Sequence, residues 1–260
     1  SSVEENPKAT KLKEELLSLA DRTNRGFQAS QQERTKIKDI VYELASSNPS
    51  KNPARGYYES SSTSTSTRTH SSSYDVESND DVTISGKWTL IYTDAPDITS
   101  LDTSRNPFAT AKLGRIGQEC NPPFIKNVIE WRRPDWASNL PLSGTDSSKI
   151  LQKVVTSASA TSSKPLLVDL KVAGLELESG ESDSVATASD GINDLVQRVE
   201  EQGLPAGILS AMPVDLKGPL NPPFGQFEIL YVDEDIRAIR TSQNYLAVNQ
   251  RIQRVEDEWF

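Results

Sequence analysis

The chain has only one cysteine and one histidine in 260 residues, and both scarcities limit its chemistry. With Cys120 as the only thiol, no disulfide can form within the chain, and a reducing compartment fits better than a secretory one. His70 is the only imidazole and lies in a Ser/Thr tract, which argues against a Ser-His-Asp triad, a Cys-His pair and a typical zinc site. The sequence therefore predicts no catalytic residues, no metal and no cofactor.

Long hydrophobic runs and an excess of positive charge are also missing. No stretch approaches the roughly 18 consecutive apolar residues that a membrane-spanning helix needs, so we do not expect an integral membrane protein. The formal net charge is -9, and an acidic chain disfavours the phosphate contacts that supply most nucleic-acid affinity. We therefore expect no nucleic-acid partner.

The first 55 residues predict two helices. One begins after Asn6 with the first-turn proline Pro7, and the other begins at a capping box of Ser30 and Glu33 and ends before Pro49. Each helix has one apolar face, made by Leu12, Leu16, Leu19 and Ala20 in the first and by Ile37, Ile40, Val41 and Leu44 in the second. We expect a helical hairpin that packs on itself or on the next domain.

Residues 56–80 have a different composition. Between Ser60 and Ser73, every residue except Arg68 and His70 is Ser or Thr, and such a stretch cannot bury enough surface to fold. This segment would either let the helical arm swing or simply loop out. We therefore predict three regions: a helical arm at 1–55, a disordered linker at 56–80 and a barrel domain at 81–260.

From residue 81 onward the apolar pattern mostly has a period of two, which is typical of β-strands. The strand candidates are rich in β-branched and aromatic residues. They are Trp88–Thr93, Phe124–Trp131, Leu166–Leu177, Phe227–Val232, Ile236–Thr241 and Tyr245–Ile252. Helical spacing at Ile192, Leu195, Val196 and Val199 predicts one short inserted helix. The pattern predicts a mainly β fold, in which closure into an antiparallel β-barrel leaves no exposed edges.

The segments that open and close this half of the chain are the most specific. Gly86–Thr93 carries a Gly-x-Trp, and Tyr231–Arg240 is followed by Tyr245–Val248. The first segment resembles the opening strand of the PAP/fibrillin family of plastid lipid-associated proteins, and its Gly-x-Trp also resembles the first strand of lipocalins. The second resembles the C-terminal signature of that family, and Phe108–Val128 is similar to a segment between them. The Ser-rich loops in 143–190 resemble nothing in the family.

The resemblance implies a lipocalin-like barrel in a plastid such as the chloroplast, associated with plastoglobules or thylakoids. It also implies binding of prenylquinones, carotenoids or fatty acids, and a small barrel lined by alternate apolar side chains can enclose one such ligand. We therefore expect a protein, not an enzyme, that stores, shields or delivers hydrophobic molecules at a peripheral membrane or lipid-droplet surface. One alternative is an interaction protein whose helical arm docks a lipid-metabolic enzyme or photosynthetic complex. Another is an isomerase or transferase that acts on a bound lipid.

Two sets of apolar side chains are candidates for the ligand-binding wall of the barrel. Strict alternation places each set on one face of its strand. The sets are Trp88, Leu90 and Tyr92 in the first strand and Phe227, Ile229 and Tyr231 in a later one. If both faces point inward, these residues either line a ligand cavity or fill a barrel too narrow to hold anything.

A polar candidate site follows in the turn after Val232. Asp233, Asp235 and Arg237 match the acidic-turn-arginine motif of the family, and they could supply a general acid or, as we interpret them, a polar latch at the barrel mouth. The alternative is a hairpin turn with an ion pair to Arg237 or Arg240, which contributes little when exposed. Two carboxylates without further clustered ligands are weak evidence for a metal site.

Overall fold

The computed structural model describes residues 7–58, 82–102, 104, 111–132, 149–179, 182–187 and 225–253. The helix predicted around Ile192 lies outside these residues, as does most of the predicted linker. The helical elements are α1 (Pro7–Arg22), α2 (Gln31–Ala45), the 3-10 turn η1 (Arg55–Tyr57) and α3 (Pro96–Thr99). The strands are β1 (Gly86–Thr93), β2 (Lys112–Asn121), β3 (Phe124–Arg132), β4 (Lys149–Thr161), β5 (Lys164–Ser179), β6 (Ser182–Thr187), β7 (Gln226–Val232), β8 (Ile236–Thr241) and β9 (Leu246–Arg251).

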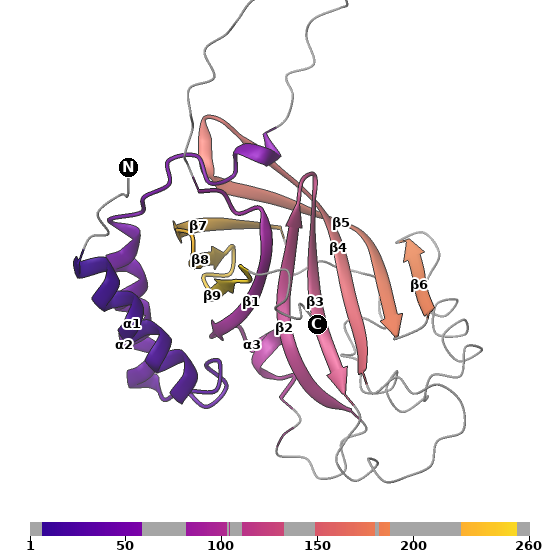
Figure 1. The fold of residues 1–260 in the computed structure, drawn as a ribbon, viewed down its shortest axis with the longest axis horizontal. Helices are drawn as coiled ribbons and strands as arrows, with labels where there is room; N and C mark the ends of the chain where they lie inside the picture. The colour runs from indigo at the N-terminus through magenta and orange to yellow at the C-terminus, as the bar shows by residue number, and fades with distance from the viewer. Residues whose placement is uncertain are drawn as a thin grey trace, which may run out of the picture.

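Eight strands form a closed antiparallel barrel, which confirms the predicted fold class (Figure 1). Their order is β4-β3-β2-β1-β9-β8-β7-β5, and pairing between β4 and β5 closes the ring. The edge of β5 that faces away from β4 pairs with two strands. Residues 167–169 pair with β7, whereas residues 174–179 pair with β6. Strand β6 therefore extends the sheet beside the barrel without belonging to the ring.

Two β-bulges break the alternation that the sequence predicts. In β1 the register against β9 shifts between Leu90 and Tyr92, and in β7 the register against β8 shifts between Ile229 and Tyr231. An extra residue in one strand turns every later side chain to the opposite face. The prediction that each set of three shares one face is therefore wrong for Tyr92 and Tyr231, which lie on the outer face of the barrel.

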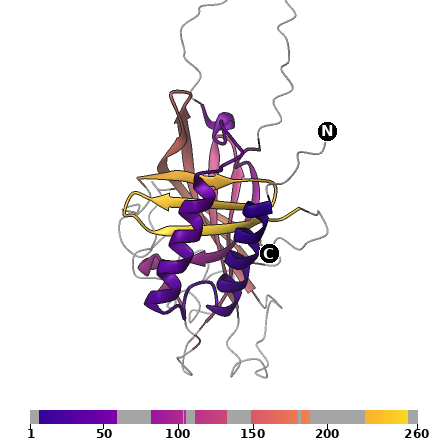
Figure 2. The same ribbon diagram turned by 90° about the vertical axis from the view of Figure 1, so that its left-hand side faces the viewer.

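The two helices cover this outer face. Figure 2 shows α1 and α2 in front of β7, β8 and β9. Their apolar faces share one buried cluster with strand residues, which include Tyr92, Leu230, Tyr231, Ile236, Ala238, Leu246 and Val248. The predicted capping box of α2 is present, with the Glu33 amide donating to Ser30 Oγ at 3.3 Å and the Ser30 amide donating to Glu33 Oε2 at 2.9 Å. The helical hairpin thus packs on the barrel.

The loop between α1 and α2 docks on the end of β1. The Thr93 amide donates to the Arg25 carbonyl at 3.0 Å, and Arg25 Nη1 donates to the Gly114 carbonyl of β2 at 2.7 Å. Gly26 next to it has a φ of +86°, and a Cβ there would lie 2.3 Å from the Thr93 carbonyl oxygen. Only glycine fits this close approach in the left-handed region, so the position of the arm is tied to the backbone at Gly26.

One end of the barrel is closed by the chain on both sides of the predicted linker. Ser50 Oγ donates to the Val82 carbonyl at 2.6 Å, and the Ile84 amide donates to the Pro53 carbonyl at 2.9 Å. Tyr57 is buried with Ile84 in the interior cluster. The structure describes residues 56–58 as part of the folded region, and the residues that flank the predicted linker are hydrogen-bonded to each other.

Among the described residues, no helix has both the length and the apolar character needed to cross a membrane.

The shared cluster makes a testable prediction about the arm. Leu16 of α1 is fully buried against the barrel, so Leu16→Ala should lower the free energy of unfolding by about 2–5 kcal/mol. Urea unfolding followed by circular dichroism measures this change, and one cooperative transition is expected because arm and barrel share a core. Ser18→Ala, at an exposed position of the same helix, is the control. A change below about 0.5 kcal/mol for Leu16→Ala would show that the helices contribute little to the core.

Candidate functional site

A buried arginine lies at the centre of the barrel interior. Arg237 of β8 is fully buried, and its Nη2 donates to Asn249 Oδ1 of β9 at 3.2 Å. The same guanidinium donates to Cys120 Sγ at 3.2 Å and to Gln118 Oε1, both on β2. Because β9 and β1 separate β8 from β2 in the ring, these contacts cross the interior.

The contacts of Arg237 continue as a chain of amides. Gln118 Nε2 donates to Asn127 Oδ1 of β3 at 2.6 Å. Gln118 pairs across the sheet with Asn127 and also with Trp88, so these side chains share the inner face. Near the end of β3 and the start of β4, Trp131 Nε1 donates to Gln152 Oε1 at 2.8 Å. The inner wall of strands β2, β3 and β4 is therefore unusually polar for a barrel core.

Trp88 is contacted by two guanidinium groups. The guanidinium carbon of Arg251 lies 4.1 Å from the ring centroid, and that of Arg237 lies 4.8 Å from it. Arg251 also donates to the Ser85 carbonyl at 2.7 Å and to the Thr83 carbonyl at 2.8 Å. Burial lowers the pKa of Arg251, and the nearby charge of Arg237 lowers it further. The ring of Trp88 thus stabilises two cations close to each other.

The exposure of inward side chains differs between the two halves of the barrel. At the closed end, Ile125 and Ile229 are fully buried in the interior cluster. Farther along the inner face, Gln118, Asn127 and Ile129 are only half-buried. These inward side chains are therefore more exposed than those at the closed end.

The structure brings together part of the predicted wall. Trp88, Phe227 and Ile229 lie in the interior cluster, and Leu90 pairs with Asn249 on the same inner face. Two other predicted residues lie in the cluster beneath the helices, namely Tyr92 and Tyr231. Burial raises the pKa of Tyr92 to about 12. Whether any of the inward residues binds a ligand remains a prediction.

The three residues of the predicted latch are not brought together. Asp233 accepts from Lys13 Nζ of α1 at 2.9 Å and from the Tyr231 hydroxyl at 2.7 Å on the outside of the barrel. Asp235 lies 3.4 Å from the same Lys13 nitrogen, whereas Arg237 points into the interior. The alternative pairing with Arg240 is not present either, because Arg240 binds Glu228. The acidic turn therefore holds α1, and the arginine belongs to a separate site.

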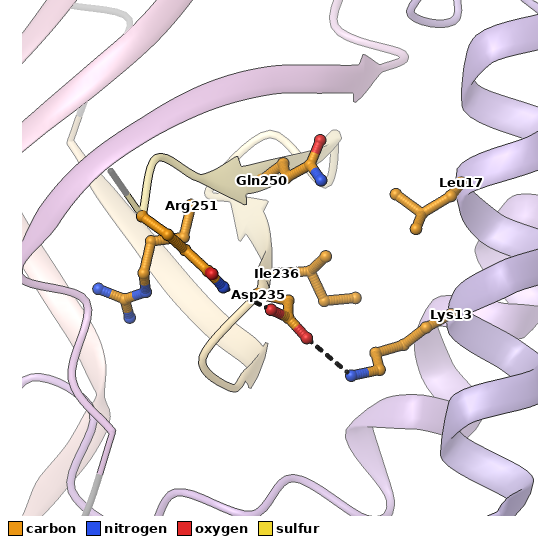
Figure 3. Close-up of a pocket in the computed structure, with 7 residues that line it drawn as sticks. Lys13, Leu17, Asp235, Ile236, Gln250 and Arg251 are labelled. Atoms are coloured by element: carbon orange, nitrogen blue, oxygen red, sulfur yellow. Dashed lines mark hydrogen bonds and ion pairs between the residues drawn. The ribbon is translucent and has the colours of Figure 1, made fainter. Parts of the chain in front are cut away.

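A pocket lies between this turn and α1 (Figure 3). It has a volume of about 320 Å³ and opens between the helix and strands β8 and β9. Figure 3 shows the ion pair of Lys13 with Asp235 among the lining residues, together with the apolar side chains of Leu17 and Ile236. Lys13 and Asp235 are already paired with each other and Arg251 is bonded to backbone carbonyls, so this pocket offers less to a ligand than the barrel interior does.

Within the part of the chain that the structure describes, no group of three or more His, Cys, Asp or Glu side chains is placed to hold a metal ion. Burial raises the pKa of the Cys120 thiol, and this effect outweighs the opposite influence of Arg237. A neutral, fully enclosed thiol is a poor nucleophile. The chemistry that the interior does offer is hydrogen-bond donation and positive charge, which suits binding.

Comparison with protein families decides the identity. A sequence model of the PAP_fibrillin family matches residues 10–58 and 71–249. The chain belongs to the PAP/fibrillin family. This match covers the helical arm as well as the barrel, so both are parts of the fibrillin architecture. Fibrillins are structural, lipid-associated proteins of plastids, which agrees with a barrel that has an accessible inner wall. A search of the curated proteins gave no significant match.

Sequence reasoning missed the polar interior of this fibrillin. Three inward amides were not identified from the sequence, namely Gln118, Asn127 and Gln152. Each lies in a strand whose side chains alternate between the two faces of the sheet. Arg237 shares a face with Ile239 and not with Ile236, and that register could have placed it inside the barrel. The missing information was which face of each strand points inward.

The carboxylate of Asp233 generates a prediction about pH. Burial alone would raise its pKa, but hydrogen bonds from the Ile236 amide, Tyr231 and Lys13 outweigh burial and hold the pKa below the usual 3.8. The carboxylate therefore stabilises the fold fully above about pH 5, and this contribution is lost as the pH falls through the lowered pKa. Asp233→Asn should lower the free energy of unfolding by about 1–3 kcal/mol at pH 7.

The difference between Asp233→Asn and wild type should shrink steadily in urea melts below the ordinary aspartate pKa of 3.8. Glu234→Gln removes an exposed carboxylate from the same turn and is the matched control. An equal loss at pH 7 in both variants would indicate that general charge, not the contacts of Asp233, stabilises the turn.

Proposed function

We propose that this fibrillin binds one hydrophobic molecule inside the barrel and stores, shields or delivers it in plastids. Prenylquinones, carotenoids and fatty acids are the candidate ligands, and the surface of plastoglobules or thylakoids is the proposed location. Membership in a lipid-associated family and the closed barrel support this proposal. It requires no catalytic group.

One observation carries the proposal. Ile129 is an aliphatic side chain on the inner face of β3, yet it is half-buried and not sealed in a packed core. Its cross-strand neighbour Ile116 and the nearby Val154 add apolar surface to the same wall. An inward apolar side chain that is still half-exposed, next to buried apolar neighbours, is a surface that a lipid tail can cover.

The energetics of such binding are favourable. Covering several hundred Å² of isoprenoid or acyl tail yields roughly 10 kcal/mol gross at about 25 cal/mol per Å². Part of this free energy offsets the loss of translational and rotational freedom on association. The remainder is enough for specific binding without any covalent chemistry.

The alternative of an interaction protein has less support. Docking through the helical arm would use its surface, but the apolar faces of α1 and α2 are already covered by the barrel. Ion pairs such as Lys8 with Glu43, at 2.6 Å, occupy the exposed side of the hairpin. A protein partner at the arm would therefore meet a polar, self-paired surface.

Filling the inner wall tests the proposal. Ile129→Trp adds bulk at the accessible part of the interior and should weaken binding of retinol, a neutral fluorescent isoprenoid, by roughly tenfold or more. Lys171→Trp places the same indole at an exposed position of β5 and should leave the affinity unchanged. Fluorescence titration of the full chain gives the dissociation constants, and thermal melts verify folding.

Tyr231→Ala distinguishes a residue that lines the ligand site from one that only stabilises the fold. Because Tyr231 lies beneath the helices, this change should cost about 2–4 kcal/mol of stability without altering retinol affinity. Unchanged retinol binding by folded Ile129→Trp, or reduced binding by folded Tyr231→Ala, would place the ligand outside the barrel interior.

A further inference from the structure

The barrel interior contains a cation without a carboxylate partner. Arg237 is fully buried, and its hydrogen-bond acceptors Gln118, Cys120 and Asn249 are neutral groups. Among the described residues, no carboxylate forms an ion pair with it. A buried charge is costly unless an opposite charge and hydrogen bonds compensate for it, and here only the hydrogen bonds are present.

The neighbouring titratable groups do not supply the missing negative charge. Burial raises the pKa of both Cys120 and Tyr57, so the thiol and the phenol remain neutral at physiological pH. Arg251 adds a second positive charge beside Trp88. The described side chains at the centre of the barrel therefore carry more positive charge than negative charge.

The orientation of the interior amides follows from what their partners can do. A guanidinium only donates, so the oxygen of Gln118 must face Arg237 and its nitrogen must face the oxygen of Asn127. This leaves Asn127 Nδ2 as a buried donor with no partner. By the same logic the indole N–H of Trp131 fixes the oxygen of Gln152, and Gln152 Nε2 is also a buried donor with no partner.

Three of the unsatisfied buried atoms among the described residues lie on the inner face of the barrel. Asn127 pairs with Val154 across β3 and β4, and Ile129 pairs with Gln152, so the two amides lie at diagonal positions of adjacent strands. Arg237 Nε is unsatisfied as well. All three atoms are donors, and buried donors in proteins nearly always have acceptors. What this wall lacks is an acceptor with negative charge.

We propose that the ligand of the barrel carries a free carboxylate at the end of an apolar chain, and that Arg237, Asn127 and Gln152 receive this head group. Arg237 supplies the balancing charge, and the two amides supply N–H donors. The apolar chain lies against Ile116 and Ile129. This inference rests on the proposed function, because it names the chemical class of the lipid.

A quinone head group fits the same wall less well. Its carbonyl oxygens accept hydrogen bonds from the amides but leave the charge of Arg237 uncompensated. A carboxylate accepts the same bonds and neutralises the guanidinium, and charge-assisted hydrogen bonds are about twice as strong as neutral ones. The acid is therefore the class that satisfies both features of the site.

The test compares an acid with its own ester in the wild-type full chain. The probes are cis-parinaric acid, a fluorescent polyene fatty acid, its methyl ester, and decylubiquinone as a neutral competitor. We expect the acid to bind at least about tenfold more tightly than the ester. Equal affinity of acid and ester, or tighter binding of the quinone than of the acid, would overturn the carboxylate proposal while leaving lipid binding intact. Absence of binding by all three probes, and by retinol, would instead overturn the proposed function.

Variants assign the preference to residues. Arg237→Met keeps the length of the side chain without its charge, and the acid-to-ester ratio should fall to within about threefold of unity. Arg240→Met makes the same replacement on the outer face of β8 and should keep the wild-type ratio. Asn127→Leu removes an amide donor and should weaken acid binding several-fold with little effect on the ester. If Arg237→Met does not fold, the Asn127→Leu ratio decides, and a ratio unchanged from wild type counts against the proposal.

Discussion

The buried guanidinium of Arg237 is the constraint on which the interior of this fibrillin depends. It connects β8 to β9 through Asn249 and to β2 through Gln118 and Cys120, and it contacts the ring of Trp88 on β1. A charge of this kind cannot be left in a purely apolar core. Its presence therefore accounts for the run of amides across β2 and β3 and for the placement of an aromatic ring beside it.

The outer face of the same strands follows a different principle. There the apolar side chains are covered by α1 and α2, and the acidic turn at Asp233 holds Lys13 of the first helix. The bulges in β1 and β7 let each strand contribute apolar side chains to both faces of the sheet. In β1 Leu90 points inward and Tyr92 outward, and in β7 Ile229 points inward and Tyr231 outward. The fold thus combines a hydrophobic cluster beneath the helices with an interior that is apolar at the closed end and polar along the inner wall of β2, β3 and β4.

Much of the fold could be predicted from local sequence signals. The capping box at Ser30, the alternating strands and the Gly-x-Trp at Gly86 all correspond to features of the structure. The bulges could not be placed from the sequence, because both lie in continuous apolar runs, Leu90–Tyr92 and Ile229–Val232, in which either face of the strand could be the inward one. The prediction of the candidate site was affected most, because the bulges determine which face Tyr92 and Tyr231 occupy.

Arg237 shows a second reason why the site was harder to predict than the fold. Its neighbours in sequence, Asp233 and Asp235, suggested an electrostatic group at a turn, but the strand that begins at Ile236 carries the arginine to the opposite side of the sheet. Sequence proximity was therefore a poor guide to spatial proximity. Which face is inward depends on contacts with β9 and β2, and Gln118 of β2 lies 119 residues away in the chain.

The bonded flanks of the Ser/Thr-rich segment have a consequence for how this protein tolerates change. Ser50 and Pro53 are hydrogen-bonded to Val82 and Ile84, so the described residues on the two sides of 59–81 lie at nearly the same place. The free energy of closing such an excursion grows only with the logarithm of its length, and doubling the length adds about 0.6 kcal/mol. Insertions and deletions there are therefore nearly neutral for stability. Substitutions in this segment, or insertion of a fluorescent or affinity module, should leave the contacts between the barrel and its arm intact.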